Sequence, residues 1–153
     1  MEAAGRRLGA GAHSYGDLSA GDWFLTPPVT LEAEHIDRFA ALSGDVFEIH
    51  MSDEAAQAHG FRARVAHGLL VLALSDGLKN QAEAKFKAIA SLGWDWSFRR
   101  PVYIGDTIKV RISIAEMRET KRADRGIVRL NLDVTNQHGE VVQTGSNLLM
   151  VSR

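Results

Sequence analysis

Residues 68–74 read Gly-Leu-Leu-Val-Leu-Ala-Leu, and this run decides the fold. Apolar side chains occupy every side of a helix here rather than one stripe, so such a helix is expected to be buried on both faces. The continuation, from Lys79 to Ala88, is more polar and is expected to reach solvent. The run therefore predicts a central helix that another layer of structure must cover.

Downstream of this helix, from about residue 93, the hydrophobic period changes to two, which is typical of strands. Residues 136–139, Asn-Gln-His-Gly, predict the turn of a hairpin whose second strand spans residues 141–151. The second half is therefore expected to be an antiparallel meander that wraps the helix, giving an α+β domain. Its edges or outer face need a partner, which predicts a homo-oligomer. The alternating residues are Trp94, Trp96 and Phe98, then Ile108, Val110, Ile112 and Ile114, then Val128, Leu130, Leu132 and Val134.

Upstream of the central helix, the pattern predicts a short strand at residues 22–25 and two short helices. Thr30 is a candidate N-cap for the first helix, which Gly44 ends. Ser52 is a candidate N-cap for the second helix, which closes at Gly60.

Length and composition are those of one globular domain, with 153 residues, 45% of them apolar and 24% charged. The 18 basic and 19 acidic side chains nearly cancel, which argues against a nucleic-acid-binding protein. No apolar run could span a membrane, and the lack of cysteine excludes disulfides. We expect a cytoplasmic protein with a flexible tail over residues 1–14 and one domain over residues 15–153.

Two segments carry candidate chemistry. Asp45 and His50 place a carboxylate and an imidazole five residues apart, in an irregular segment between two helices. Gly68 stands at the mouth of the central helix, where a ligand can approach the backbone closely and free N–H groups can bind negative charge. Hydration of a 2-enoyl thioester needs an acid, a base and donors to the thioester oxygen, and it requires no metal. These residues can supply all three groups.

The sequence resembles the MaoC-like family and its (R)-specific enoyl-CoA hydratases over roughly residues 16–152. The matching features are Gly44-Asp45 with His50, the run Ala66-His67-Gly68-Leu69 that places Gly68 eighteen residues after His50, and residues 98–107, Phe-Arg-Arg-Pro-Val-Tyr-Ile-Gly-Asp-Thr.

The resemblance implies a single hot-dog domain, with an antiparallel sheet wrapped around one long buried helix and short overhanging helices carrying the catalytic motif. It also implies a homodimer acting on an acyl-CoA, with no organic cofactor beyond the CoA of the substrate and no metal. By carry-over, Asp45 and His50 hold the water, and the Gly68 N–H belongs to the oxyanion hole. The residues expected to contact the substrate are Phe47, Ala66, His67 and Leu69.

Two other functions remain open at this stage. The family often has Asn-Pro where Phe47 and Glu48 stand, and this departure leaves room for a non-catalytic acyl-CoA-binding subunit. A hot-dog thioesterase is the other alternative, with Asp76 on the central helix as its carboxylate, although a capping or pairing role at the helix end suits Asp76 better. The residues that could meet CoA phosphates are Arg62, Arg64, Arg99 and Arg100.

Overall fold

A computed structural model describes residues 5–153. Residues 1–4 of the expected tail lie outside this range, but residues 5–14 are not a free tail. Leu8 is buried and its N–H donates to the Trp23 carbonyl at 2.8 Å. The strand β1 (Gly11–His13) pairs in parallel with β4 (Ala84–Phe86). Burial of Leu8 and backbone hydrogen bonding along β1 both stabilise this packing. The ordered domain therefore begins earlier than residue 15.

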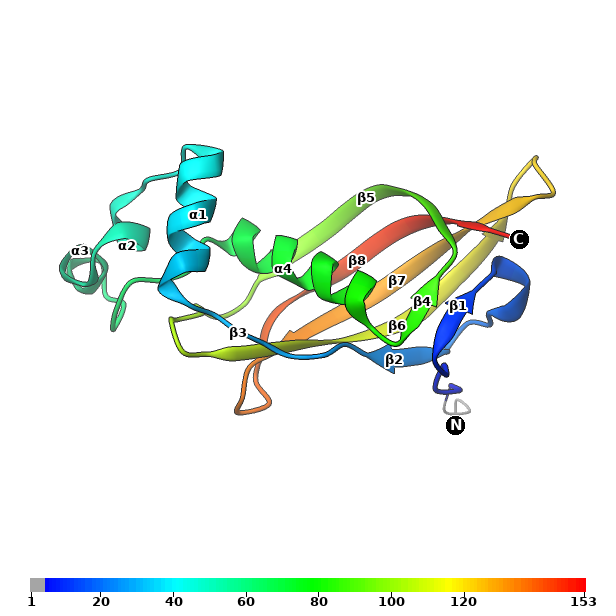
Figure 1. Ribbon diagram of the computed structural model, residues 1–153, viewed down its shortest axis with the longest axis horizontal. Helices are drawn as coiled ribbons and strands as arrows, with labels where there is room; N and C mark the ends of the chain where they lie inside the picture. Colours follow the sequence, from blue (N-terminus) through cyan, green and yellow to red (C-terminus); the bar gives the residue numbers. More distant parts are fainter. Residues whose placement is uncertain (1–4) are drawn as a thin grey trace.

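Three short helices lie together at one end of the molecule: α1 (Ala33–Ser43), α2 (Glu48–Met51) and α3 (Asp53–Ala58) (Figure 1). Gly44 ends α1 in the left-handed conformation, with φ of 78°, and the Ser52 side chain caps α3, as expected.

The Thr30 N-cap was a wrong prediction. Thr30 lies in β3 (Val29–Thr30), which pairs with β6 (Thr107–Glu119), and α1 begins behind Glu32. The chain stays extended through Leu31 because this side chain is fully buried in the core.

The main sheet has the strand order β2-β6-β7-β8-β5, with every neighbouring pair antiparallel. The predicted hairpin is confirmed as β7 (Arg125–Thr135) and β8 (Val141–Ser152). The strand β2 (Trp23–Leu25) matches the predicted one, and a 3₁₀ turn covers Tyr15–Asp17. The meander was only partly right, because β5 (Ala88–Phe98) pairs with β8 rather than with β6.

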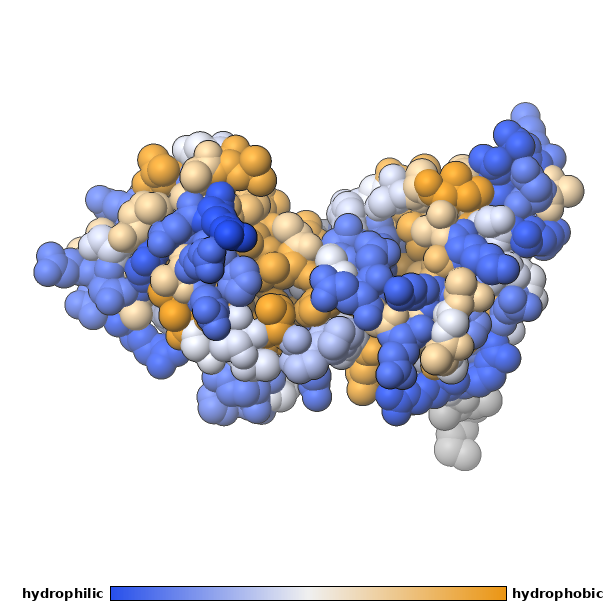
Figure 2. Space-filling view, viewed as in Figure 1, coloured by the Kyte–Doolittle hydropathy of each residue, from blue (hydrophilic) through white to orange (hydrophobic). Residues whose placement is uncertain are grey.

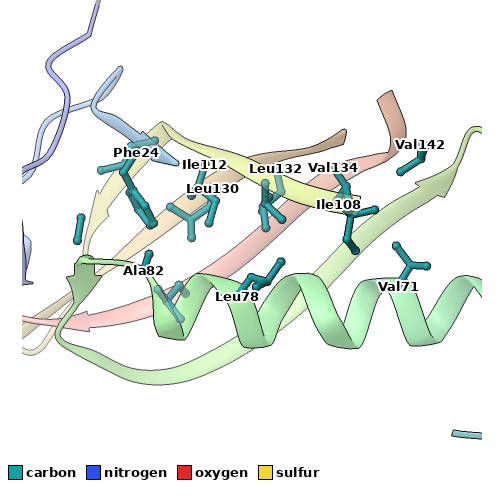
Figure 3. Packing of buried hydrophobic residues seen from close by; sticks show 14 of the residues in the cluster. Phe24, Val71, Leu78, Ala82, Ile108, Ile112, Leu130, Leu132, Val134 and Val142 are labelled. Atoms are coloured by element: carbon teal, nitrogen blue, oxygen red, sulfur yellow. The ribbon is translucent and has the colours of Figure 1, made fainter. Parts of the chain in front are cut away.

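The long helix α4 (Gly68–Gln81) lies in the concave side of this sheet (Figure 1). Figure 3 shows Val71, Leu78 and Ala82 facing side chains from three strands of the sheet, which form one apolar core. The sheet residues labelled there are Ile108, Ile112, Leu130, Leu132, Val134 and Val142, all of them buried. The predicted α+β arrangement, with a sheet around one helix, is confirmed.

The expectation that residues 79–88 reach solvent is largely confirmed, because most of residues 80–88 are exposed. Lys79 itself is only 4% exposed and pairs with Asp76 at 2.8 Å and with Asn147 at 3.1 Å. The expectation that both faces of α4 are buried needs correction. The face that bears Leu69 and Ala73 is exposed in the single chain, so burial of the helix is one-sided here. Within residues 5–153, no helix is long and apolar enough to cross a membrane.

Candidate active site

Asp45 occupies a tight turn directly behind the left-handed end of α1. Its backbone N–H donates to Ser43 Oγ at 3.1 Å, and its Oδ1 accepts the N–H of Phe47 at 3.2 Å. These local bonds are typical of the turns that aspartate and serine build. They fix the carboxylate at the entrance to α2 while leaving the side chain exposed.

His50 lies in α2 and is buried, with an exposed fraction of 8%. Its Nδ1 is 2.8 Å from the Val65 carbonyl. A carbonyl only accepts, so Nδ1 carries the hydrogen and Nε2 keeps its lone pair. Burial lowers the pKa of His50 below its ordinary value, while the bond to Val65 opposes this shift. His67 lowers the pKa further and the Asp45 carboxylate raises it.

His67 joins the two candidate catalytic residues. Its Nε2 donates to the backbone carbonyl of Asp45 at 2.8 Å, and its ring stacks on His50 with centroids 3.9 Å apart. Phe39 packs against the same ring at 4.8 Å. His67 is only 2% exposed, and within residues 5–153 its Nδ1 has no hydrogen-bond partner. It therefore contacts both Asp45 and His50, and its predicted contact with the substrate stays a prediction.

Asp45, His50 and His67 each offer one ligand atom, and these atoms lie within 4.8 Å of one another. A metal would need two imidazole lone pairs that converge in the ring planes. The His50 and His67 rings are stacked at only 25°, and His67 Nε2 already donates to the Asp45 carbonyl. This geometry suits a bound water better than a chelated ion, and a reaction without a metal stays a prediction.

Gly68 begins α4, directly beside this cluster. The first bond within the helix runs from the Val71 N–H to the His67 carbonyl, so the N–H groups before it have no partner in the helix. A Cβ on Gly68 would lie 2.4 Å from the ring of Phe98, which covers the helix start. A side chain at this position would therefore have to displace the Phe98 ring, which is 57% exposed.

A mainly apolar cavity of about 320 Å³ opens between α2, the start of α4 and the end of β5. His50, Ala66 and Gly68 line it, so three predicted site residues share one cavity. Asp45, Phe47, His67 and Leu69 are not part of its wall; Phe47 and Leu69 are exposed instead. The other side chains in the wall include Ile49, Phe61, Val71, Phe98 and Val102. A larger open groove, of about 1100 Å³, lies beside β2 and the end of α4, and none of the predicted site residues line it.

Two further residues support the site: Arg64, which the sequence suggested only as a contact for CoA phosphates, and Gln143, which it did not single out. Arg64 binds the His50 carbonyl through Nε at 2.9 Å and Asp37 through Nη2 at 2.6 Å, which anchors α2 to α1. Gln143, on β8, contacts Gly68 from the far side of the cavity. The charge of Arg64 and the amide of Gln143 within an apolar strand are visible in the sequence, but nothing there indicates which groups they bind.

Of the remaining predicted groups, Arg99 and Arg100 line the cavity. Arg62 lies over the Tyr103 ring at 4.2 Å. Asp76 forms an ion pair with the buried Lys79, as its place near the helix end suggested.

Comparison with known proteins gives concordant matches. The family described as "MaoC like domain" matches residues 19–136. An (R)-specific enoyl-CoA hydratase from Aeromonas caviae is 31% identical over 113 residues, which cover 74% of this chain and 81% of that protein. The solved structure of a MaoC-like dehydratase from Rhodospirillum rubrum has a TM-score of 0.85 at 30% identity, covering 92% of this chain and 97% of the other. A Mycobacterium tuberculosis protein with a double hotdog fold has a TM-score of 0.80 at 22% identity, covering 92% of this chain and 44% of the other, so the fold described above is a hot-dog fold.

Proposed function

This chain belongs to the MaoC-like family of hydratases and dehydratases, and we propose that it catalyses the reversible hydration of a 2-enoyl-CoA to an (R)-3-hydroxyacyl-CoA. The observation that carries the proposal is the meeting of Asp45, His50 and the start of α4 beside one apolar cavity. A carboxylate, an imidazole with a free lone pair and unpaired amide donors are the groups that this addition requires.

In the proposed reaction, Asp45 and His50 hold one water molecule. The water oxygen bonds to C3 of the enoyl group as one of its protons passes to the pair, and a proton is delivered to C2. Negative charge that develops on the thioester oxygen is stabilised by the Gly68 N–H. Because the two side chains interact strongly, the proton donor to C2 is not assigned to either of them alone. Dehydration runs through the same steps in reverse.

The proposed reaction uses no organic cofactor beyond the CoA of the substrate, and no metal. The apolar wall of the cavity suits an acyl chain, and the guanidinium groups of Arg99 and Arg100 suit CoA phosphates. We also propose a cytoplasmic location.

The decisive experiment is a hydration assay with crotonyl-CoA, followed by chiral analysis of the product. We expect loss of the enoyl-thioester absorbance, formation of the (R) alcohol and no release of free CoA thiol. Thiol release would favour the thioesterase alternative. Tight binding without turnover, for crotonyl-CoA and for longer, branched and ring-derived enoyl-CoAs, would favour a binding subunit.

We further propose that the protein is a homodimer joined along β5. This strand is the last one in the sheet, pairs with β8 alone among the strands of residues 5–153, and is exposed along most of its length. Ile89 and Leu92 on β5 are each 45% exposed. Figure 2 shows apolar surface in the region where β5 bends in Figure 1. A long apolar edge strand invites pairing with another strand, which a second copy can supply about a two-fold axis.

A further inference from the structure

A buried amide contacts the start of α4 from the sheet. Gln143 lies in β8, in a part of the strand that faces the cavity, and it is only 2% exposed. Its Nε2 donates to the Gly68 carbonyl at 3.0 Å, and its Oε1 accepts the Trp96 Nε1–H at 2.7 Å. An amide buried among apolar neighbours is costly unless both of its ends are bonded, and both ends are bonded here.

The orientation of this amide follows from its two partners. An indole N–H can only donate and a carbonyl can only accept, so the oxygen of Gln143 must face Trp96 and its nitrogen must face Gly68. Glutamate lacks the donor for Gly68, and methionine lacks both groups.

The sheet makes room for the indole of Trp96. Gly145 is the register partner of Trp96, and a Cβ there would lie 2.6 Å from the indole and 2.1 Å from the Asp95 carbonyl. With no side chain at Gly145, the indole can lie across β8 and reach Gln143, two residues away.

The start of α4 needs such a restraint. Glycine at the first helical position admits close packing against Phe98, but it also leaves the backbone freer than any other residue would. The Gly68 carbonyl belongs to the same peptide unit as the Leu69 N–H. A donor on that carbonyl fixes the peptide plane and strengthens the N–H at its other end.

We propose that Gln143, oriented by Trp96, is a positioning residue that sets the amide donors at the start of α4 against the thioester oxygen of the substrate. This inference rests on the proposed hydratase function. Gln143 acts through the backbone of Gly68 and Leu69 and takes no part in proton transfer.

The test compares Gln143→Met, Trp96→Phe and the double variant in crotonyl-CoA hydration, with Trp94→Phe as a matched control. Trp94 lies two residues before Trp96 on β5, makes a cation–π contact with Lys79 and packs edge-to-face on the Trp96 ring at 5.6 Å. Trp94→Phe keeps an aromatic ring beside Trp96 and leaves both bonds of Gln143 in place. We expect kcat to fall about tenfold for Gln143→Met, less than for loss of an oxyanion donor itself. Trp96→Phe should lose less, the double variant should match Gln143→Met, and KM should change little. Trp94→Phe should behave like the wild type.

A spectroscopic readout separates positioning from a purely structural role. Crotonyl-CoA labelled with ¹³C at the thioester carbonyl is bound to Asp45→Asn protein, with and without each substitution, and the carbonyl stretch is recorded. We expect the shift caused by the helix donors to shrink in Gln143→Met and Trp96→Phe but not in Trp94→Phe. If melting temperatures fall while kcat and the carbonyl frequency of folded variants stay at wild-type values, the inference is overturned.

Trp96→Phe keeps Gln143 in place and decides the matter if Gln143→Met does not fold. A wild-type protein that hydrates no enoyl-CoA overturns the proposed function itself. An active wild type whose variants match it overturns only the role of Gln143.

Discussion

The imidazole of His50 is restrained so that a single atom is available for chemistry. Nδ1 of His50 donates a hydrogen bond to the Val65 carbonyl, and the ring of His67 stacks on one face of the imidazole. His67 in turn binds the backbone of Asp45, so the carboxylate and the imidazole are held by one side chain. This arrangement leaves Nε2 of His50 as the free basic atom, in the wall of the cavity.

The first prediction concerns the pair itself. Asp45→Asn keeps the size of the side chain and its bond from Phe47, but removes the charge that can accept a proton. We expect kcat for crotonyl-CoA hydration to fall at least ~10²-fold, the usual scale for general acid–base catalysis. The melting temperature should barely change, because Asp45 is exposed.

His50→Gln should lose activity to a similar degree, and the double variant should be scarcely worse than the poorer single one, since the two groups act together. This variant also disturbs the buried bond to Val65, so its free energy of unfolding should drop by about 1 kcal/mol. Full activity in both single variants would show that the pair has only a structural role.

The second prediction is the pH dependence that follows from the buried imidazole. The pKa of His50 is lowered, chiefly by burial, so the neutral ring persists to a lower pH than in an ordinary histidine, whose pKa is about 6.5. As pH falls through the lowered pKa, Nε2 gains a proton and can no longer accept one from water. The acid limb of kcat/KM should therefore have its midpoint below about pH 6.5. Circular dichroism at each pH controls for unfolding, and a midpoint at or above that value contradicts the assignment.

Sequence alone could single out Asp45, His50 and Gly68 as candidates, because their spacing carries the signal; the structure brings them close together, and their catalytic roles stay predictions. It could not predict what holds them. His67 binds a carbonyl 22 residues earlier in the chain, and Gln143 binds one 75 residues earlier. Such contacts depend on tertiary packing, which leaves no periodic trace in the sequence.

At the scale of elements, the weakest part of the site is α2, which has only four residues. A helix of this length is not stable by itself, so it depends on what it packs against. Arg64 supplies this support: its side chain is only 17% exposed, and its guanidinium reaches both the His50 carbonyl and Asp37 on α1.

The third prediction tests this anchor. Arg64→Met keeps much of the apolar stem but breaks both polar links, so His50 should drift from its productive position. We expect kcat/KM to fall at least about tenfold, since small displacements of a catalytic group are costly. Arg38→Met is the control, because Arg38 pairs with Glu34 on the exposed face of α1. Equal activities in the two variants would remove Arg64 from the positioning of α2.

The strands show where periodicity stops being informative. Alternation correctly predicted β5, β6 and β7, because it reports which face of a strand packs on the core, and the turn at residues 136–139 predicted β8. It says nothing about which strand lies alongside, so the pairing of β5 with β8 could not be predicted. The short strand β3 was missed because two residues carry no period.

At the scale of the whole molecule, the sheet covers α4 from one side and leaves two surfaces open. One is the face of α4 with Leu69, which is 60% exposed, and the other is the free edge of β5. Edge strands in stable proteins are usually short, charged or covered, and β5 is long and carries exposed apolar residues. A second copy that pairs along β5 would extend the sheet and cover this edge.

The last prediction follows from this open edge. Light scattering after gel filtration should show a dimer or a multiple of one at micromolar concentration. Leu92→Lys places a charge on the exposed apolar stretch of β5 and should shift the protein toward monomer, because an unpaired charge is costly to bury in an interface. Leu25→Lys is the matched control, because Leu25 is 37% exposed on β2, at the opposite edge of the sheet. This variant should remain a dimer. A wild-type monomer, or loss of the dimer in Leu25→Lys with retention in Leu92→Lys, would contradict pairing through β5.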